Sequence, residues 1–185
     1  MRVIAGTARG VTLAAPRDRA TRPITDRVKE TLFGILGDRV VDADVLDLYA
    51  GSGAIGIEAL SRGAAHCTFV ERSQQAVAIL NANLVRAGVA DRGQVVTVDV
   101  ERFLDAAPRH RYDLAVLDPP YEARAILAPL ERLVPHLAAG GTVVVKRFWR
   151  TELFAVAGLD PRRERRFGET VLTFLERAAG TDQES

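Results

Sequence analysis

Carboxylates stand at the ends of successive short apolar runs in this sequence. The runs are DVLDL, AHCTFVE, GQVVTVD and YDLAVLD, and each is typical of a buried strand. Stretches with apolar residues at helical spacing separate them, and strands that alternate with helices form parallel sheets. Ligands bind such sheets beyond the carboxyl ends of the strands. We therefore expect a shared ligand-binding edge that carries Asp47, Glu71, Asp99 and Asp118.

The run that ends in Asp47 continues as LYAGSGAIGIEAL, in which Gly51, Gly53 and Gly56 spell G-x-G-x-x-G. Glycine lets a backbone approach a ligand closely, and amides at a helix start favour negative groups. The loop therefore suits a dinucleotide, through its pyrophosphate, or S-adenosylmethionine, through its methionyl part. Asp47 favours the second, because a carboxylate fits poorly beside a pyrophosphate but well beside an ammonium group.

The next two carboxylates indicate a nucleoside without choosing between these cofactors. Glu71 follows Gly51 by 20 positions, which suits hydrogen bonds from ribose hydroxyls. Asp99 is placed to accept from the adenine amine, with Val98 and Val100 as apolar contacts to the ring. The alternatives are a solvated glutamate at a strand end and an ordinary loop aspartate.

The fourth run ends in LDPPY, and this stretch favours the methyl donor. Pro119 and Pro120 fix the backbone and remove two amide donors, which leaves carbonyl oxygens beside the Asp118 carboxylate. Tyr121 adds an aromatic face. Together they form a clamp for a planar group that carries an NH2, for which a nicotinamide enzyme has no evident use. The alternative is a rigid turn with a packed tyrosine.

The order of elements predicts a doubly wound, mostly parallel α/β sheet. Strands are expected at 44–50, 65–72, 93–100, 112–120 and 141–148, and helices at 54–63, 73–88, 101–107 and 125–141. Ser73 and Gly88 are the expected caps of the second of these helices, and Thr25 the N-cap of a helix near the start of the chain. The segments 153–159 and 169–177 are expected to pair as an antiparallel hairpin around RRERR.

Composition bounds the function classes. A chain of 185 residues with 48% hydrophobic content suits one globular domain. No run of 18 apolar residues is present and the first residues lack the pattern of a signal peptide, so we expect a cytoplasmic protein without a membrane span. The single cysteine, Cys67, excludes an internal disulfide framework and is expected in a buried strand. The histidines are scattered, so no metal site is expected, and Glu58 is interpreted as structural.

Charge is unevenly spread although the net charge is only +1. Residues 1–39 carry eight basic side chains against four acidic ones, and RRERR at 162–166 adds four arginines. Basic character at both ends suggests that a polyanion docks beside a neutral catalytic body. The alternative is a set of solvated arginines.

The sequence resembles a known family at several blocks. RVIAGTARGVTLAAP, TRPITDRVKETLFGIL and LDLYAGSGAIGIEALSRGA, followed downstream by DPPY, are similar to the bacterial 16S ribosomal RNA guanine-N2 methyltransferases of the RsmD family. The resemblance extends from Arg2 to about Glu176, and the N-terminal blocks are its most specific part. Ile24 stands where the family usually has a second threonine, and Tyr49 where phenylalanine is more usual.

The resemblance implies a Rossmann-like class I S-adenosylmethionine-dependent methyltransferase with a seven-stranded sheet. It implies an RNA-contacting N-terminal β-hairpin extension (1–20), a methyltransferase domain (21–178) and a flexible tail (179–185). The cofactor site would comprise Asp47, Tyr49, Gly51, Ser52, Gly53, Glu71, Arg72, Asp99, Val100 and Asp118. The catalytic set would be Asp118, Pro119, Pro120 and Tyr121. From their positions, Arg9, Arg22, Arg27 and Lys146 are expected to contact RNA; the alternatives are a plain capped helix for Arg22 and Arg27 and solvation at a strand end for Lys146.

The expected reaction transfers a methyl group from S-adenosylmethionine to a guanine N2 amine in 16S ribosomal RNA, within the small subunit or its assembly intermediate. The expected enzyme is a monomer. Three alternatives remain open: a methyltransferase acting on DNA adenine N6 or on a protein glutamine, a non-catalytic RNA-binding assembly factor, and, more distantly, a dehydrogenase. Enzymes that modify glutamine typically carry asparagine in place of Asp118, and DNA enzymes usually need a further recognition region.

Overall fold

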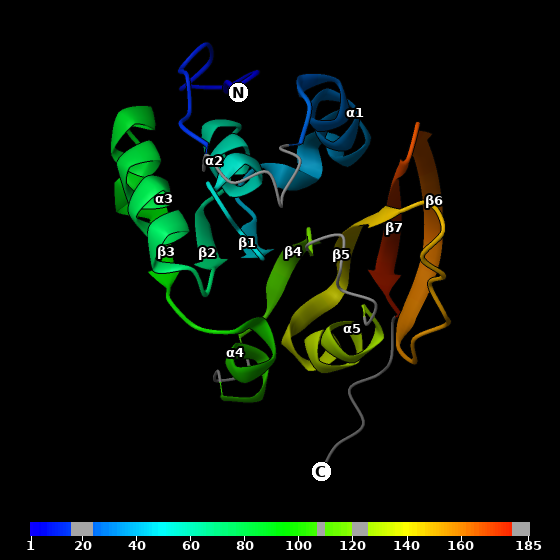
Figure 1. Ribbon diagram of the computed structural model, residues 1–185. Coiled ribbons are helices and arrows are strands. Elements are labelled where there is room, and N and C mark those ends of the chain that lie inside the picture. The colour runs from blue at the N-terminus through cyan, green and yellow to red at the C-terminus, as the bar shows by residue number, and fades with distance from the viewer. Residues whose placement is uncertain (16–23, 107–109, 120–125, 179–185) are drawn as a thin grey trace.

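The computed structural model describes residues 1–15, 24–106, 110–119 and 126–178. In these ranges the chain forms a seven-stranded sheet of order β3-β2-β1-β4-β5-β7-β6 (Figure 1). The strands are β1 (Asp44–Leu48), β2 (His66–Val70), β3 (Gly93–Val96), β4 (Tyr112–Leu117), β5 (Leu137–Phe148), β6 (Leu159–Phe167) and β7 (Thr170–Arg177). The strands β1 to β5 pair in parallel, whereas β7 pairs antiparallel with β5 and β6. The strand order reverses between β1 and β4, so the carboxyl ends of these two strands flank the expected ligand site.

Helices cover both faces of the sheet, as expected for a doubly wound fold (Figure 1). One face carries α1 (Asp26–Leu36), α2 (Ala54–Ser61) and α3 (Gln74–Ala87), and the other carries α4 (Val100–Ala106) and α5 (Leu127–Leu133). Short 3-10 turns follow at Gly37–Val40, Ala90–Arg92 and Val134–His136. Among the described residues, no helix has the length and hydrophobicity that crossing a bilayer requires.

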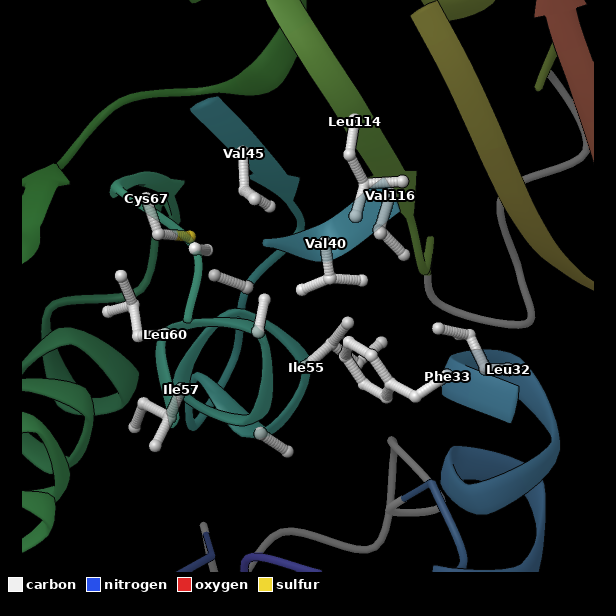
Figure 2. Packing of buried hydrophobic residues seen from close by; sticks show 14 of the residues in the cluster. Leu32, Phe33, Val40, Val45, Ile55, Ile57, Leu60, Cys67, Leu114 and Val116 are labelled. Atoms are coloured by element: carbon white, nitrogen blue, oxygen red, sulfur yellow. The ribbon is translucent and has the colours of Figure 1, made fainter. Parts of the chain in front are cut away.

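The core between α2 and the sheet is closely packed. Every residue of α2 is buried, and Figure 2 shows Ile55 of this helix beside Phe33 of α1, with Cys67 of β2 and Val116 of β4 lining the same cluster. Cys67 is 1% exposed, which confirms its interpretation as a buried strand residue. The apolar side predicted for α1 is buried as well (Val28, Leu32, Phe33 and Leu36).

The N-terminal segment is fastened to α2 by hydrogen bonds. Its expected hairpin is limited to a single antiparallel bridge between Arg2 and Thr12. The fully buried Glu58 accepts from the amides of Ile4 (2.8 Å) and Ala5 (3.0 Å), and it pairs with the equally buried Lys29 at 3.1 Å. Glu58 therefore joins the segment, α1 and α2, as its structural interpretation predicts.

Several element boundaries differ from those expected. The helix predicted over 125–141 ends at Leu133, because Pro135 supplies no amide for its continuation and the chain enters β5 at Leu137. Gly140 and Gly141, which look like a helix end, lie inside β5 beside a register shift in its pairing with β4. The expected strand 93–100 ends at Val96, and Val100 instead begins α4.

The expected C-terminal hairpin is present, but its first strand is displaced. RRERR lies within β6 instead of in the connection, and the turn falls at Gly168, where φ is +57°. β6 is the last strand of the sheet, and edge strands commonly carry charged side chains that discourage further pairing. A charged run can therefore form a strand here without burying its charge.

Candidate active site

The glycine loop between β1 and α2 is the first part of the site. Gly51 and Gly53 have φ of +55° and +79°, and Tyr49 also has a positive φ of +62°. A Cβ on Gly51 would meet nothing closer than the Tyr49 carbonyl oxygen at 4.0 Å, whereas one on Gly53 would lie 2.1 Å from a Leu80 methyl carbon. One on Gly56 would lie 2.2 Å from the Phe69 ring. Gly51 thus leaves the backbone open to a ligand, while Gly53 and Gly56 allow α2 to pack closely.

Asp47 lies buried beneath this loop. Its Oδ2 accepts a hydrogen bond from the amide of Gly56 at 2.9 Å. Burial raises the pKa of Asp47 to about 7; the Gly56 bond opposes this rise, and the charges of Asp118 and Glu71 add to it. No cationic side chain in the described ranges pairs with Asp47. The site therefore holds a buried carboxylate whose negative charge would be stabilised by a cation.

Glu71 connects the end of β2 to the glycine loop. Its Oε2 accepts from the amide of Gly51 at 2.9 Å, and its Oε1 accepts from the amide of Ser73 at 2.8 Å. Ser73 itself caps α3, as predicted. Because each carboxylate oxygen has a second lone pair, Glu71 can hold the loop and still accept from a ligand hydroxyl.

The next strand end brings Asp99 near Tyr49. Asp99 Oδ1 accepts from the Glu101 amide at 3.0 Å at the start of α4, and Arg72 NH1 lies 3.9 Å from Asp99 Oδ2. Burial raises the pKa of Tyr49 to about 12, and the negative charges of Asp99 and Glu101 contribute to that rise. Val100 is buried in the core under α4, so its side chain packs within the protein.

Asp118 follows β4, and its carboxylate is held by a lysine. Lys146 Nζ donates to Asp118 Oδ1 at 2.7 Å, and their side chains are 9% and 23% exposed. Burial raises the pKa of Asp118, while Lys146 acts in the opposite direction. No described residue donates to Oδ2 in a recorded contact, so this oxygen can accept from a ligand. Pro119 is half-buried beside it, whereas Pro120 and Tyr121 of the predicted clamp lie outside the described residues.

The structure changes the role expected for one predicted RNA contact. Arg9 and Arg27 are exposed, as an RNA contact requires, and Arg22 lies outside the described residues. Lys146 is buried and bonded to Asp118, so its expected surface contact with phosphate is wrong. An ammonium buried beside a carboxylate is held by that partner, and its position belongs to the Asp118 site.

Asn83 is a contributor that sequence reasoning missed. It is fully buried on α3, where its amide nitrogen donates to the carbonyls of Ser52 and Ala14, each at 2.9 Å. Its oxygen accepts from the Ala14 amide at 2.9 Å. Asn83 thus connects the N-terminal segment to the glycine loop. An asparagine between Leu80 and Leu84 on an apolar helix face was the available signal, since a buried amide needs partners.

Known proteins share both the sequence and this fold. Residues 1–176 match the family described as "Conserved hypothetical protein 95". "Putative rRNA methyltransferase YlbH" of Bacillus subtilis (strain 168) is 38% identical over 175 residues, which cover 92% of this chain and 95% of that protein. "Ribosomal RNA small subunit methyltransferase D" of Escherichia coli (strain K12) is 42% identical over 123 residues, which cover 65% of this chain and 60% of that protein.

A solved structure agrees over almost the whole length. "Putative methyltransferase yhhF from Escherichia coli" has a TM-score of 0.85 and 34% identity, and the match covers 97% of this chain and 98% of that one. "RNA methyltransferase from Salinibacter ruber in complex with S-Adenosyl-L-homocysteine" shares the fold at a TM-score of 0.66 and 20% identity, over 88% of this chain and 98% of that one. The chain therefore belongs to the RsmD family, and its fold is the Rossmann-like class I fold of S-adenosylmethionine-dependent methyltransferases.

Proposed function

We propose that this protein is an S-adenosylmethionine-dependent ribosomal RNA methyltransferase that acts on the N2 amine of a guanine in 16S ribosomal RNA. The observation that carries the proposal is the placement of Asp118. It lies at the switch in strand order, near Asp47 at the cofactor loop, with one carboxylate oxygen bound by Lys146, which leaves the other as an acceptor for a ligand. Relatives named as ribosomal RNA methyltransferases support the class of substrate.

The residues at the β1 and β2 ends fit S-adenosylmethionine. Asp47 is a buried carboxylate without a cationic partner among the described residues, and the ammonium of the methionyl part would balance its charge. Gly51 leaves the backbone approachable, and Glu71 retains acceptor capacity for ribose hydroxyls. A pyrophosphate would instead add negative charge to a cluster that already contains Asp47, Glu71 and Asp118. When bound, S-adenosylmethionine supplies an electrophilic methyl group on a positively charged sulfur.

Asp118 and Pro119 would orient the acceptor amine. The lone pair of a guanine amine is normally delocalised into the ring, which makes the amine a weak nucleophile. Asp118 Oδ2 and the Pro119 carbonyl would accept its two N–H bonds and turn the lone pair out of conjugation. Lys146, on Oδ1, would fix the orientation of the carboxylate and help to keep it ionised. Catalysis of this kind rests on orientation and electrostatics.

The substrate base would have to leave its stack to reach Asp118, as base-modifying enzymes require. A chain of 185 residues has limited surface with which to select one base in a folded RNA. We therefore infer that ribosomal proteins already bound to the RNA help to present the guanine. Equal methylation rates for protein-free RNA and for hypomethylated small subunits would refute this second inference without affecting the first.

The proposed reaction is tested by offering methyl-labelled S-adenosylmethionine to hypomethylated small subunits, protein-free 16S RNA and duplex DNA. The expected result is label in RNA that digests to N2-methylguanosine, and its loss in Asp118→Ala. Far-UV circular dichroism and thermal unfolding serve as the control that the variant is folded. Label in DNA would refute the proposal that the substrate is ribosomal RNA. An Asp118→Ala variant with an undiminished rate would refute the role of Asp118 in orienting the acceptor amine.

A further inference from the structure

Two guanidinium groups stack on one indole just beyond the carboxyl end of β5. Trp149 follows Phe148 directly, and its amide donates to the Glu169 carbonyl at 2.9 Å, which fixes it to the turn between β6 and β7. The Arg150 and Arg166 guanidinium carbons lie 4.6 and 4.5 Å from the centroid of the ring of Trp149. These distances are typical of cation–π contacts, which restrict where the two arginines can point.

Stacking orders these guanidinium groups but leaves most of their donors available. Arg166 uses Nε to bind the Gly168 carbonyl at 2.8 Å, and its terminal nitrogens have no recorded partner among the described residues. Arg150 has no recorded hydrogen bond or ion pair within the same ranges. Both side chains belong to exposed residues. The planar fork of N–H donors on a guanidinium group matches the geometry of a phosphate.

The acidic residues of the same edge strand are already neutralised. Glu164 is bound by Arg147 and Thr173, each at 2.7 Å, and Asp160 lies 3.8 Å from Arg162. Arg163 and Arg165 are exposed on the opposite face of the strand and add further positive charge. Two exposed acidic residues lie close to Trp149, Glu152 in the chain and Glu169 through its carbonyl, so the positive charge at this surface comes from Arg150 and Arg166 themselves. A pair of guanidinium groups favours an anionic partner.

Sheet register relates this surface to the Asp118 site. Arg166 pairs with Val171, which pairs with Arg147 of β5; one step back, Arg165, Leu172 and Lys146 form the neighbouring row. Lys146 is the partner of Asp118. With neighbouring strands about 4.8 Å apart, the β6 backbone lies about 10 Å from that of β5 across β7. Side chains of adjacent rows point to opposite faces, so Arg166 and Lys146 lie on different faces of the sheet. An RNA strand with a base at Asp118 would therefore pass around the carboxyl end of β5, where Trp149 lies, to reach Arg150 and Arg166.

We propose that Arg150 and Arg166, ordered by Trp149, bind backbone phosphates of the RNA that flanks the methylated base. The proposal deepens the proposed function, on which it rests, by assigning a docking surface for the substrate. Contacts of this kind set the register and orientation of a nucleic acid without reading its sequence. The surface would hold the strand while the base is turned out of its stack. Phosphate is favoured over a protein carboxylate because an RNA strand supplies regularly repeated anions along the strand edge.

The test measures binding of a fluorescently labelled 16S RNA transcript by anisotropy over a range of salt concentrations. The double variant Arg150→Gln/Arg166→Gln removes both charges, and Arg162→Gln is the matched control. Arg162 belongs to the same exposed strand, but it already pairs with Glu176 at 3.3 Å and with Asp160. Two lost phosphate contacts should weaken binding about 25-fold at ~0.1 M salt and reduce the slope of log K against log salt by about 1.4.

The outcomes separate this surface from the proposed reaction. If the double variant binds RNA as tightly as Arg162→Gln, with the same dependence of log K on log salt, the proposed phosphate-binding surface is refuted, even if the wild type methylates guanine N2. A wild type that binds RNA through these arginines but leaves no N2-methylguanosine overturns the reaction and keeps the surface. Poly-glutamate that competes as well as RNA, by an amount lost in the double variant, would assign the surface to an acidic protein instead. Affinity for S-adenosylhomocysteine should be equal in all variants.

Discussion

The carboxylates of the site are held in two different ways on the two sides of the strand switch. At the ends of β1 and β2, Asp47 and Glu71 accept hydrogen bonds from backbone amides of the glycine loop and its neighbours. At the end of β4, Asp118 is held by the ammonium group of Lys146. Backbone amides fix the position of a carboxylate but carry no net charge, whereas an ammonium group also neutralises the negative charge of the carboxylate.

The two carboxylates therefore differ in charge compensation. Asp47 has no cationic partner among the described residues, whereas Asp118 is paired with Lys146. Burial raises the pKa of Asp47 to about 7, so a cation that arrives there would gain from a charge not yet compensated. Lys146 opposes the same effect of burial at Asp118, which favours an anionic acceptor before any ligand binds. The first arrangement suits the ammonium of a cofactor, and the second suits a neutral amine that must donate its N–H bonds.

The largest expected effect is at Asp47. Its pKa in the folded protein, about 7, lies above the ordinary 3.8, so the folded state retains a proton that the unfolded state releases. Stability should therefore fall as pH rises from about 4 to about 7 and stay low above that, by up to about 4 kcal/mol. Asp47→Asn should remove this loss, so that the variant is more stable than wild type near pH 8 but binds S-adenosylhomocysteine more weakly.

Urea unfolding of both proteins near pH 4.5 and pH 8 measures this difference. The expected gain of Asp47→Asn over wild type is large at the higher pH and small at the lower one. A gain in stability that does not change with pH would contradict the raised pKa of Asp47, because it would mean that the folded protein stabilises the ionised carboxylate.

The next effect should come from removing the balancing charge at Asp118. Lys146→Met leaves a buried carboxylate without its partner, which should lower the free energy of unfolding at neutral pH by about 3 kcal/mol. The pKa of Asp118 should rise, so the acid limb of the rate–pH profile should move to higher pH, and Lys146→Arg should restore it. Arg147→Met is the matched control, because Arg147 neighbours Lys146 on β5 but pairs with the exposed Glu164. The same profile for both methionine variants would contradict the role of Lys146.

A smaller effect should separate the packing glycine from the ligand-facing glycine. A Cβ at Gly56 would lie 2.2 Å from the Phe69 ring and 2.6 Å from the Cys67 sulfur, so Gly56→Ala should cost about 2 kcal/mol of stability. Gly51→Ala meets open space and carries only the strain of its φ of +55°, about 1 kcal/mol. Thermal unfolding with and without S-adenosylhomocysteine should show that Gly51→Ala loses more of the stabilisation by ligand. Equal losses would mean that Gly51 does not face the cofactor.

Local signals in the sequence were sufficient for much of the fold. The caps of α3 at Ser73 and Gly88 and of α1 at Thr25 are confirmed, because capping depends on neighbours in the chain. The parallel strands and their carboxyl ends follow from short apolar runs between amphipathic helices. The start of β5 and the strand that contains RRERR were misplaced, because each depends on pairing with a distant strand.

In the candidate site, too, the features that depend on local sequence are predicted and those that depend on strand pairing are not. Asp47, Glu71 and Asp118 were predicted from their positions at strand ends, and the structure brings them within electrostatic reach of one another. The pairing of Lys146 with Asp118 joins residues 28 positions apart, and it follows only from the register of β4 against β5. Without that register, a basic residue at a strand end is expected to be exposed, either to solvent or to RNA, and Lys146 fits both expectations.

The smallest expected effect tests whether Glu71 has both a structural and a ligand-binding role. Its oxygens accept from the amides of Gly51 and Ser73, and the amide of glutamine can replace only one of these acceptors. Glu71→Gln should therefore lower stability by about 1 kcal/mol through one lost hydrogen bond. The matched control is Glu101→Gln, which removes a carboxylate bonded to the exposed Arg132. If Glu71 also binds ribose hydroxyls, affinity should fall for S-adenosylhomocysteine but not for methionine alone, which has no ribose. An equal fall for both ligands would instead mean that Glu71 acts only by holding the glycine loop.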